Sequence, residues 1–259
     1  METLDIEIAN RVATVTLNRP DVRNAFNETT IAEITRVFRD LDKDGSIRAI
    51  VLAANGPAFC AGADLNWMKK MADYTHEENL ADAGQLADML HTIYRCSKPV
   101  VAKVQGDCYA GGMGLVAACD VAVSVDTAHF CLSEVKLGLI PATISPYVIK
   151  AMGESAARRY FITAERFTAA EAHRTGFVHE LATAELLDAK VAEIVKALVS
   201  NSPNAVRQAK RLVQDVASRE LTPTLIAATV EGIAQIRASD EGREGVRSFL
   251  EKRKPNWLV

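Results

Sequence analysis

The chain of 259 residues lacks any apolar run near the roughly 18 residues that a membrane-spanning helix needs. Its beginning, METLDIEIANRVATV, carries acidic residues and an alternating pattern where a signal peptide would have an apolar core. The formal net charge is −3, so the chain also lacks the basic excess typical of proteins that bind nucleic acid or anionic membranes. These absences predict a cytoplasmic protein that has neither nucleic acid nor a membrane as its partner.

Paired cysteines and metal-ligand spacings are missing as well. None of the five cysteines forms a CxxC pair, and an odd number of widely spaced cysteines in apolar surroundings predicts reduced, buried thiols. The histidines do not stand at ligand spacing either, so we expect no metal site. The residues concerned are Cys60, Cys96, Cys108, Cys119 and Cys131, and His76, His91, His129, His173 and His179.

The most unusual stretch is AGGMGLVAACD, Ala110 to Asp120, which leads three glycines into an apolar run. It contains neither GxGxxG nor GxxxxGK[ST], which argues against a phosphate-binding loop. Glycine costs roughly 1 kcal/mol relative to alanine inside a helix. The stretch therefore needs either a backbone angle that only glycine allows or a close approach to its backbone.

Short strands, turns and helices alternate along the chain, and this alternation favours an α/β fold with parallel strands. We expect a hairpin in the first residues with its turn at Ala9-Asn10, and a helix from about Asn27 to Lys43. AHFCLSE is expected to be a strand, and the chain after Pro141 to be mostly helical.

A second glycine turn, FCAGADL from Phe59 to Leu65, precedes the first one, and Asp64 can cap the helix that follows it. A helix start exposes unpaired N–H groups and a partial positive charge. Two such turns side by side could direct two backbone donors at one oxygen, as an oxyanion hole does. Alternatively, the glycines only permit tight packing of helix on strand, and the residue types alone leave both readings open.

Glu134 is a candidate acid or base. Phe130, Leu132 and Glu134 alternate, so a strand that buries the first two would also bury the carboxyl group. Burial would raise its pKa towards catalytic use. The alternative is that the strand ends at Ser133 and Glu134 lies on a solvated loop.

Five segments together resemble the enoyl-CoA hydratase/isomerase family, the crotonase fold. They are NRPDVRNAFN, FCAGADL, GDCYAGGMGLVAACDVAV, FCLSEVKLGLIP and FLEKRKPNW, in the family's order and spacing. The resemblance implies a spiral of ββα units over residues 1–195 and a helical region over residues 196–259 that together form one functional domain. It also implies a homotrimer or a hexamer built from two trimers.

The resemblance further implies that the N–H groups of Ala63 and Gly111 hold the thioester carbonyl, with Glu134 as acid and base and with no cofactor beyond CoA. Gly114 stands where hydratases of simple enoyl-CoA carry a first glutamate, so Gly114→Glu is expected to improve hydration of crotonyl-CoA. The residues implied to contact CoA are Arg23, Ala25, Ala61, Asp64, Leu65, Phe249 and Lys252, and the last two can reach the CoA of the same or of a neighbouring subunit.

PATISPY, Gly114 and the stretch LNWMKKMADYTHEENLADA look similar to bacterial hydratases of methylglutaconyl-CoA. We therefore expect a branched glutaconyl-type substrate, and Lys136 and Lys103 are candidate partners for its second carboxylate. A double-bond isomerase is the alternative, because one glutamate can suffice for it. An RNA-binding protein is the alternative of another class, but Lys69 and Lys70 are followed by acidic residues and make a sparse basic footprint.

Overall fold

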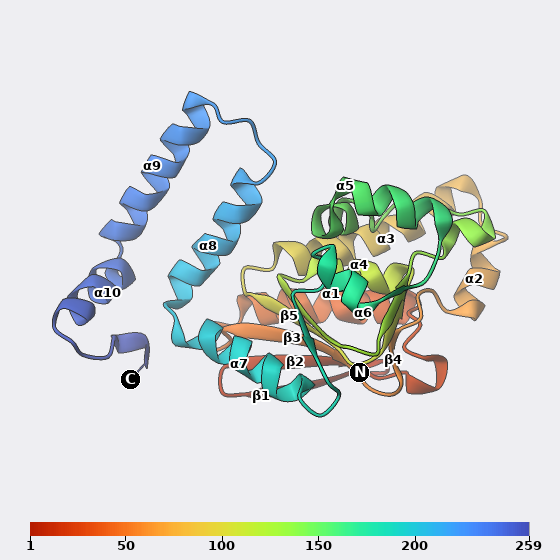
Figure 1. Ribbon diagram of the computed structural model, residues 1–259, viewed down its shortest axis with the longest axis horizontal. Helices are drawn as coiled ribbons and strands as arrows, with labels where there is room; N and C mark the ends of the chain where they lie inside the picture. Colours follow the sequence, from red (N-terminus) through yellow and green to blue (C-terminus); the bar gives the residue numbers. More distant parts are fainter. Residues whose placement is uncertain (259) are drawn as a thin grey trace.

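The computed structural model describes residues 1–258, and two sheets and a series of helices follow one another along them (Figure 1). The strands are Leu4–Ala9 (β1), Val12–Leu17 (β2), Ala49–Ala54 (β3), Ala58–Cys60 (β4), Val100–Val104 (β5), Asp107–Tyr109 (β6), Val121–Val125 (β7), His129–Cys131 (β8), Phe167–Thr168 (β9) and Glu180–Ala182 (β10). The α-helices are Glu28–Lys43 (α1), Leu65–Met71 (α2), His76–Arg95 (α3), Gly111–Ala118 (α4), Ser145–Thr163 (α5), Ala169–Arg174 (α6), Leu187–Ser200 (α7), Pro203–Val216 (α8), Pro223–Ala238 (α9) and Asp240–Leu250 (α10). Three short 3₁₀ helices are Pro20–Val22 (η1), Glu134–Leu137 (η2) and Asn256–Leu258 (η3).

The larger sheet has the order β1-β2-β3-β5-β7-β10, and it is parallel except for the hairpin of β1 and β2. The smaller sheet has the order β4-β6-β8-β9, with β4, β6 and β8 parallel to one another. Successive parts of the chain therefore place a strand in each sheet before a helix follows. This is the repeating unit that the alternation in the sequence predicts, and the α/β prediction is confirmed.

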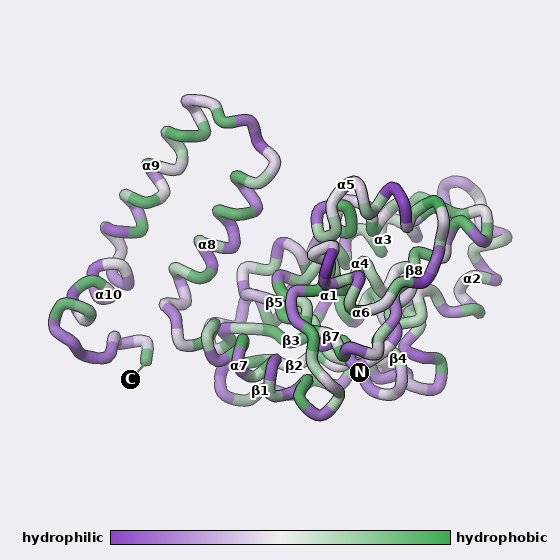
Figure 2. Tube along the Cα trace, in the orientation of Figure 1, coloured by the Kyte–Doolittle hydropathy of each residue, from purple (hydrophilic) through white to green (hydrophobic). Residues whose placement is uncertain are grey.

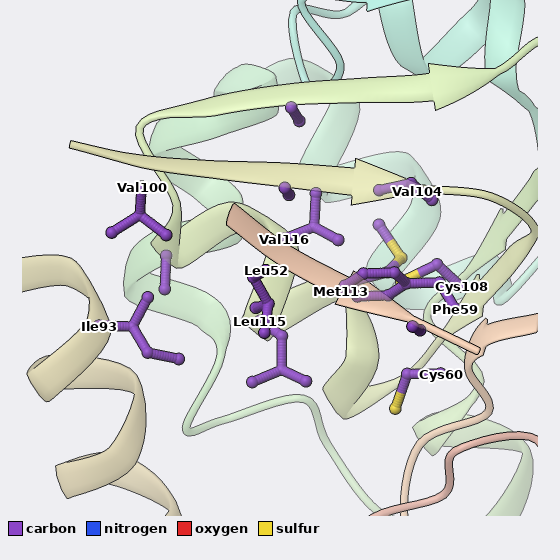
Figure 3. Close-up of a cluster of buried hydrophobic side chains, with 14 of the residues drawn as sticks. Leu52, Phe59, Cys60, Ile93, Val100, Val104, Cys108, Met113, Leu115 and Val116 are labelled. Atoms are coloured by element: carbon purple, nitrogen blue, oxygen red, sulfur yellow. The ribbon is translucent and has the colours of Figure 1, made fainter. Parts of the chain in front are cut away.

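The core lies between the two sheets and the helices α3 and α4. All six residues of β3 are buried, as expected of a central parallel strand. Figure 3 shows apolar side chains meeting from β3, β5, α3 and α4, among them Leu52, Val100, Ile93 and Leu115. The glycine-rich helix α4 is thus a core helix, and its small residues let it pack closely against the strands.

The last three α-helices form an arm that extends away from the two sheets (Figure 1), and Lys210 and Gln214 of α8 connect it to the core through side-chain hydrogen bonds. Neither α8 nor α9 contains a buried residue within the described chain. Apolar and polar segments alternate along both helices (Figure 2). The residue-195 boundary falls inside α7, which runs on to Ser200 and packs against β3, β5 and β7, so the arm itself begins with α8.

Two local predictions need correction. The hairpin turn is Asn10-Arg11, where both residues have positive φ (51° and 68°), and Ala9 still belongs to β1. Positive φ at both central positions is the conformation that fits the twist of paired strands. The strand predicted for AHFCLSE is only His129–Cys131. Among residues 1–258, no helix has both the length and the apolar character to cross a bilayer.

Candidate active site

The site residues lie beyond the ends of three neighbouring strands. β4, β6 and β8 are parallel, with Cys60 beside Cys108 and Tyr109 beside Cys131, so their carboxyl ends lie at one edge of the smaller sheet. The Ala63 turn follows β4, the start of α4 follows β6, and Glu134 follows β8. The fold therefore brings together the two glycine turns and the glutamate that the sequence singled out.

The turn after β4 is held by Phe26. The Phe26 N–H donates to the Gly62 carbonyl (2.9 Å), and the Phe26 carbonyl accepts from the Asp64 N–H (3.0 Å). Ala63 lies between these two bonds, so its own N–H points away from Phe26. That N–H donates to no acceptor within residues 1–258 and is free to bind a ligand oxygen.

Gly111 is the first residue of α4, where a backbone N–H has no acceptor inside the helix. The residue with positive φ is Ala110 (47°), whose N–H donates to the Cys131 carbonyl (2.8 Å). Gly111 has no side chain for a different reason. A Cβ there would lie 2.4 Å from Phe26 Cζ, so a close approach, and not an unusual backbone angle, requires glycine.

The two turns touch each other directly. A Cβ placed on Gly62 would lie 3.0 Å from Ala110 Cβ and 3.8 Å from the backbone nitrogen of Gly111. Gly62 itself has φ +96°, which only glycine adopts easily. Two unpaired N–H groups, one of them at a helix start with its partial positive charge, thus belong to turns in van der Waals contact. Such an arrangement suits an oxygen that gains negative charge.

Glu134 does not lie on a strand, so the alternation argument is wrong: β8 ends at Cys131, and Glu134 begins η2. The carboxyl group is nevertheless largely buried. Its Oε2 atom is inaccessible and has no hydrogen-bond partner within the described residues. Burial raises the pKa of the Glu134 carboxyl above its ordinary value. A buried carboxyl oxygen without a partner is costly, and this cost is typical of a group kept for chemistry.

Gly114 lies in α4 one turn after Gly111, and Ile144 covers it. A Cβ at Gly114 would lie 2.3 Å from Ile144 Cγ2 and 2.9 Å from Ile144 Cβ. A glutamate placed there by itself has no room, so the expectation that Gly114→Glu would add a second carboxylate has to be corrected. Ile144 comes from PATISPY and was missed because nothing in the sequence connects it to Gly114.

Two of the residues expected to contact CoA line a cavity of about 250 Å³. Arg23 and Ala61 share its wall with Pro57, Ala58, Asp107 and Tyr109. Tyr109 donates to Asp107 (2.5 Å), and burial together with this bond raises the pKa of Tyr109 to about 12. Asp107 and Tyr109 were not identified from the sequence.

Ala25, Asp64 and Leu65, which are also expected to contact CoA, differ in how far their side chains are exposed. Ala25 is buried, and its carbonyl accepts from Arg19. The Asp64 carboxylate caps α2 and pairs with Arg19 (2.7 Å). Burial alone would raise the pKa of Asp64, but these bonds outweigh it and lower that pKa. Leu65 is 75% exposed, so it alone of the three offers an open side chain.

Phe249 and Lys252 are not brought to this site within one chain. They lie at the end of α10 and just after it, and Figure 1 shows α10 on the side of the molecule opposite α2. Phe249 is 80% exposed. Lys103 is paired with Asp188 (2.8 Å), whereas Lys136 is exposed on η2 and forms no ion pair within residues 1–258.

The interleaved sheets, the two adjacent turns and the helical arm define a crotonase-fold protein. Residues 7–258 match the family model described as Enoyl-CoA hydratase/isomerase, and the chain belongs to this family. It is similar to the crystal structure of an enoyl-CoA hydratase from Shewanella pealeana, with 43% identity, a TM-score of 0.96, and coverage of 98% of this chain and 96% of the other.

Two fungal relatives are also similar over most of their length. The mevalonyl-coenzyme A hydratase sidH of Aspergillus fumigatus is 34% identical over 248 residues, which cover 94% of this chain and 90% of that protein. The enoyl-CoA hydratase ACTT6 of Alternaria alternata is 32% identical over 250 residues, with coverage of 91% and 82%.

Proposed function

We propose that the protein is an enoyl-CoA hydratase that adds water across the α,β double bond of an acyl-CoA thioester. One observation carries the proposal. Glu134, whose buried Oε2 atom has no partner within the described residues, follows β8, and the other two parallel strands of the same sheet, β6 and β4, are followed by turns with unpaired N–H groups. The names of the similar proteins support the same reaction class.

In this mechanism the Ala63 and Gly111 N–H groups donate to the thioester oxygen. Glu134 takes a proton from water while the hydroxyl group adds to the β-carbon, and the electrons move onto the thioester oxygen as an enolate. Glu134 then returns the proton to the α-carbon, so that one water molecule is added in total. Loss of one such donor costs on the order of 3 kcal/mol in the transition state. No metal or further cofactor takes part.

The preferred substrate is a branched glutaconyl-type thioester such as 3-methylglutaconyl-CoA. Its CoA part would run past Arg23 and Ala61, which line the cavity of about 250 Å³, and past the exposed side chain of Leu65. Because Lys103 is engaged with Asp188, Lys136 is the remaining candidate partner for the second carboxylate of the acyl group. It lies two residues from Glu134 on η2.

The test follows the absorbance of the enoyl-thioester band with crotonyl-CoA and 3-methylglutaconyl-CoA in parallel. We expect the band to disappear faster with 3-methylglutaconyl-CoA, and the opposite order overturns this substrate. Glu134→Gln keeps the size of the side chain and removes its titrating proton, so the rate should fall at least roughly a hundredfold while CoA affinity is kept. A wild-type rate in this variant removes Glu134 from the mechanism.

A double-bond isomerase is the second candidate, and the packing of Ile144 on Gly114 favours it. An apolar wall stands where a second carboxylate would help to position water, and a single base can move a proton between two carbons without water. Incubation of a β,γ-unsaturated acyl-CoA with the protein distinguishes the two activities. Appearance of the conjugated band without later loss indicates isomerisation alone.

The helical arm supports an assembly of trimers, for which we propose a cytoplasmic location. Its exposed apolar side chains need a partner surface, because α8 and α9 bury none of them within the described chain. A neighbouring subunit could then supply Phe249 and Lys252 to the CoA site. Light scattering tests this assembly, and a fully active monomer contradicts it. The exposed apolar residues include Leu212, Val213, Ile226, Val230, Ile233, Val246 and Phe249.

A further inference from the structure

Phe26 contacts both turns of the site, although no feature of the sequence identified it as functional. It lies in the segment NRPDVRNAFN and is 2% exposed. Its side chain carries no group that could react, so any role in catalysis must come from where it holds other atoms.

The backbone of Phe26 fixes the first donor. Its two hydrogen bonds, to the Gly62 carbonyl and from the Asp64 N–H, flank Ala63 on both sides. The direction of the Ala63 N–H is therefore set by the position of the Phe26 peptide groups. Because both hydrogen bonds join Phe26 to this turn, a shift of the Phe26 backbone also moves the Ala63 N–H group.

The ring of Phe26 fixes the second donor. Its Cζ and Cε1 atoms would lie 2.4 Å and 3.0 Å from a Cβ on Gly111, so the ring edge packs on the Gly111 backbone. The ring of Phe26 also packs on Trp67, with ring centroids 5.9 Å apart. Trp67 is itself held by a hydrogen bond from its Nε1 to Asp82 (2.9 Å). The ring of Phe26 is therefore packed both on the Gly111 backbone and on a tryptophan that is itself held in place.

We propose that Phe26 is a positioning residue that sets the separation of the Ala63 and Gly111 N–H donors, an inference that rests on the proposed function. One rigid side chain acts as the spacer between two turns from distant parts of the chain. Stabilisation of a developing oxyanion depends steeply on donor geometry, because the donors must meet the oxygen at hydrogen-bond distance in the transition state. A spacer shortened by several atoms should loosen that geometry while leaving the CoA contacts in place.

The test compares Phe26→Leu with Phe38→Leu, which removes the same atoms from an equally buried phenylalanine in α1. Each protein is bound to butyryl-CoA with an isotope-labelled thioester carbonyl, and the carbonyl stretch is measured by infrared difference spectroscopy. Free CoA affinity and kcat for the preferred enoyl-CoA are measured in parallel. Phe26→Met is the second variant should the leucine protein fail to fold, and it is read in the same way.

We expect wild type and Phe38→Leu to lower the carbonyl frequency equally, and Phe26→Leu to lose most of that shift. Its kcat should fall about tenfold to a hundredfold with unchanged affinity for free CoA. A wild-type shift and kcat in Phe26→Leu overturn the positioning role and leave the proposed function intact. An equal loss in both leucine variants overturns it as well, since loosening of the core would then suffice. If the wild-type protein binds the thioester without any shift, the oxyanion site fails, and the role of Phe26 fails with it.

Discussion

Ile144 fills the space beside Gly114, and its Cγ2 atom lies 2.3 Å from where a Cβ at Gly114 would stand. Ile144 is 1% exposed and directly precedes α5, whereas Gly114 lies in the middle of α4. The side chain of Ile144 therefore occupies the space that a side chain at position 114 would need, which requires glycine there. Because of this contact, α4 provides no second carboxylate at position 114 to act together with Glu134.

The contact predicts that Gly114→Glu does not create a better hydratase. Overpacking of a filled core typically costs about 1–3 kcal/mol, so urea unfolding should show a loss of that size. Hydration of crotonyl-CoA, followed by absorbance, should not exceed that of wild type. In Gly114→Glu/Ile144→Ala the carboxylate gains room, and crotonyl-CoA hydration should exceed that of the Ile144→Ala control. A Gly114→Glu protein of undiminished stability that hydrates crotonyl-CoA faster contradicts this prediction.

Gly111→Ala should lower activity far more than its small size suggests. The new Cβ would lie 2.4 Å from Phe26 Cζ, so either the ring or the start of α4 must move. Movement of the donor N–H should reduce kcat by about tenfold or more. The control is Gly84→Ala in α3, where nothing lies within 4 Å of the new Cβ. That change should keep kcat and stabilise the helix by roughly 0.5–1 kcal/mol. Equal kcat in the two variants would show that the Gly111 backbone does not serve catalysis.

The arm is connected to the core by an ion pair between Lys210 of α8 and Asp120 (2.7 Å). Lys210 also donates to the Lys98 carbonyl, and Asp120 accepts from the Val100 N–H. Burial raises the pKa of Asp120, while Lys210 opposes that rise. Since 8% of the Lys210 side chain and 27% of the Asp120 side chain are exposed, Lys210→Met leaves a mostly buried carboxylate without its cation.

We expect Lys210→Met to lower the free energy of unfolding by about 1–3 kcal/mol, less than for a completely buried pair. The matched control is Lys103→Met. Its partner Asp188 is 84% exposed, so the loss should stay below about 1 kcal/mol. Urea unfolding of both variants measures the difference. Equal losses would mean that the Lys210–Asp120 pair contributes no more than a surface pair.

The sequence predicted which segments meet at the candidate site better than it predicted how they pack. The turns around Ala63 and Gly111 could be found because glycines at strand ends are a local signal, and the parallel strands then bring them together. Glu134 was assigned by the resemblance, and the alternation that pointed to its burial is absent from the structure, since β8 ends three residues earlier. The Glu134 carboxyl is buried by other segments of the chain that pack around η2, and the alternation within one strand carries no information about such contacts.

Phe26 and Ile144 could not be predicted because their roles are contacts across the chain. Phe26 meets Gly111, and Ile144 meets Gly114, from segments that several strands and helices separate along the chain. Periodicity reports which face of an element is buried, but it does not report which side chain will fill a gap at a glycine. Phe249 and Lys252 were assigned by resemblance alone, and they belong to the end of α10 and the residues just after it, a helix that lies on the side of the molecule opposite α2.

The raised pKa of Glu134 predicts the pH dependence of catalysis. As a base the group must be ionised in the free enzyme, so kcat/KM should fall as the pH drops through its pKa. Because burial raises that pKa, the acid limb should lie above the ordinary range of a glutamate, about 4.3. Measurement of kcat/KM against pH checks this, with Glu134→Gln as the control that lacks the limb. A limb at or below the ordinary value would mean that a partner stabilises the ionised carboxylate.

The same pKa makes a prediction about stability. A carboxyl whose pKa is raised on folding binds its proton more tightly in the folded state, so its contribution is complete below the unfolded pKa and is lost as the pH rises through the folded pKa. Above that pH the buried charge costs free energy because Oε2 has no partner within the described residues.

Glu134→Gln carries no such charge. It should therefore be more stable than wild type at about pH 8, and the difference should shrink towards about pH 4. Urea unfolding at the two pH values measures the change. A glutamine variant that is less stable than wild type at the higher pH would show that the folded protein favours the ionised carboxylate. That result would contradict the raised pKa of Glu134.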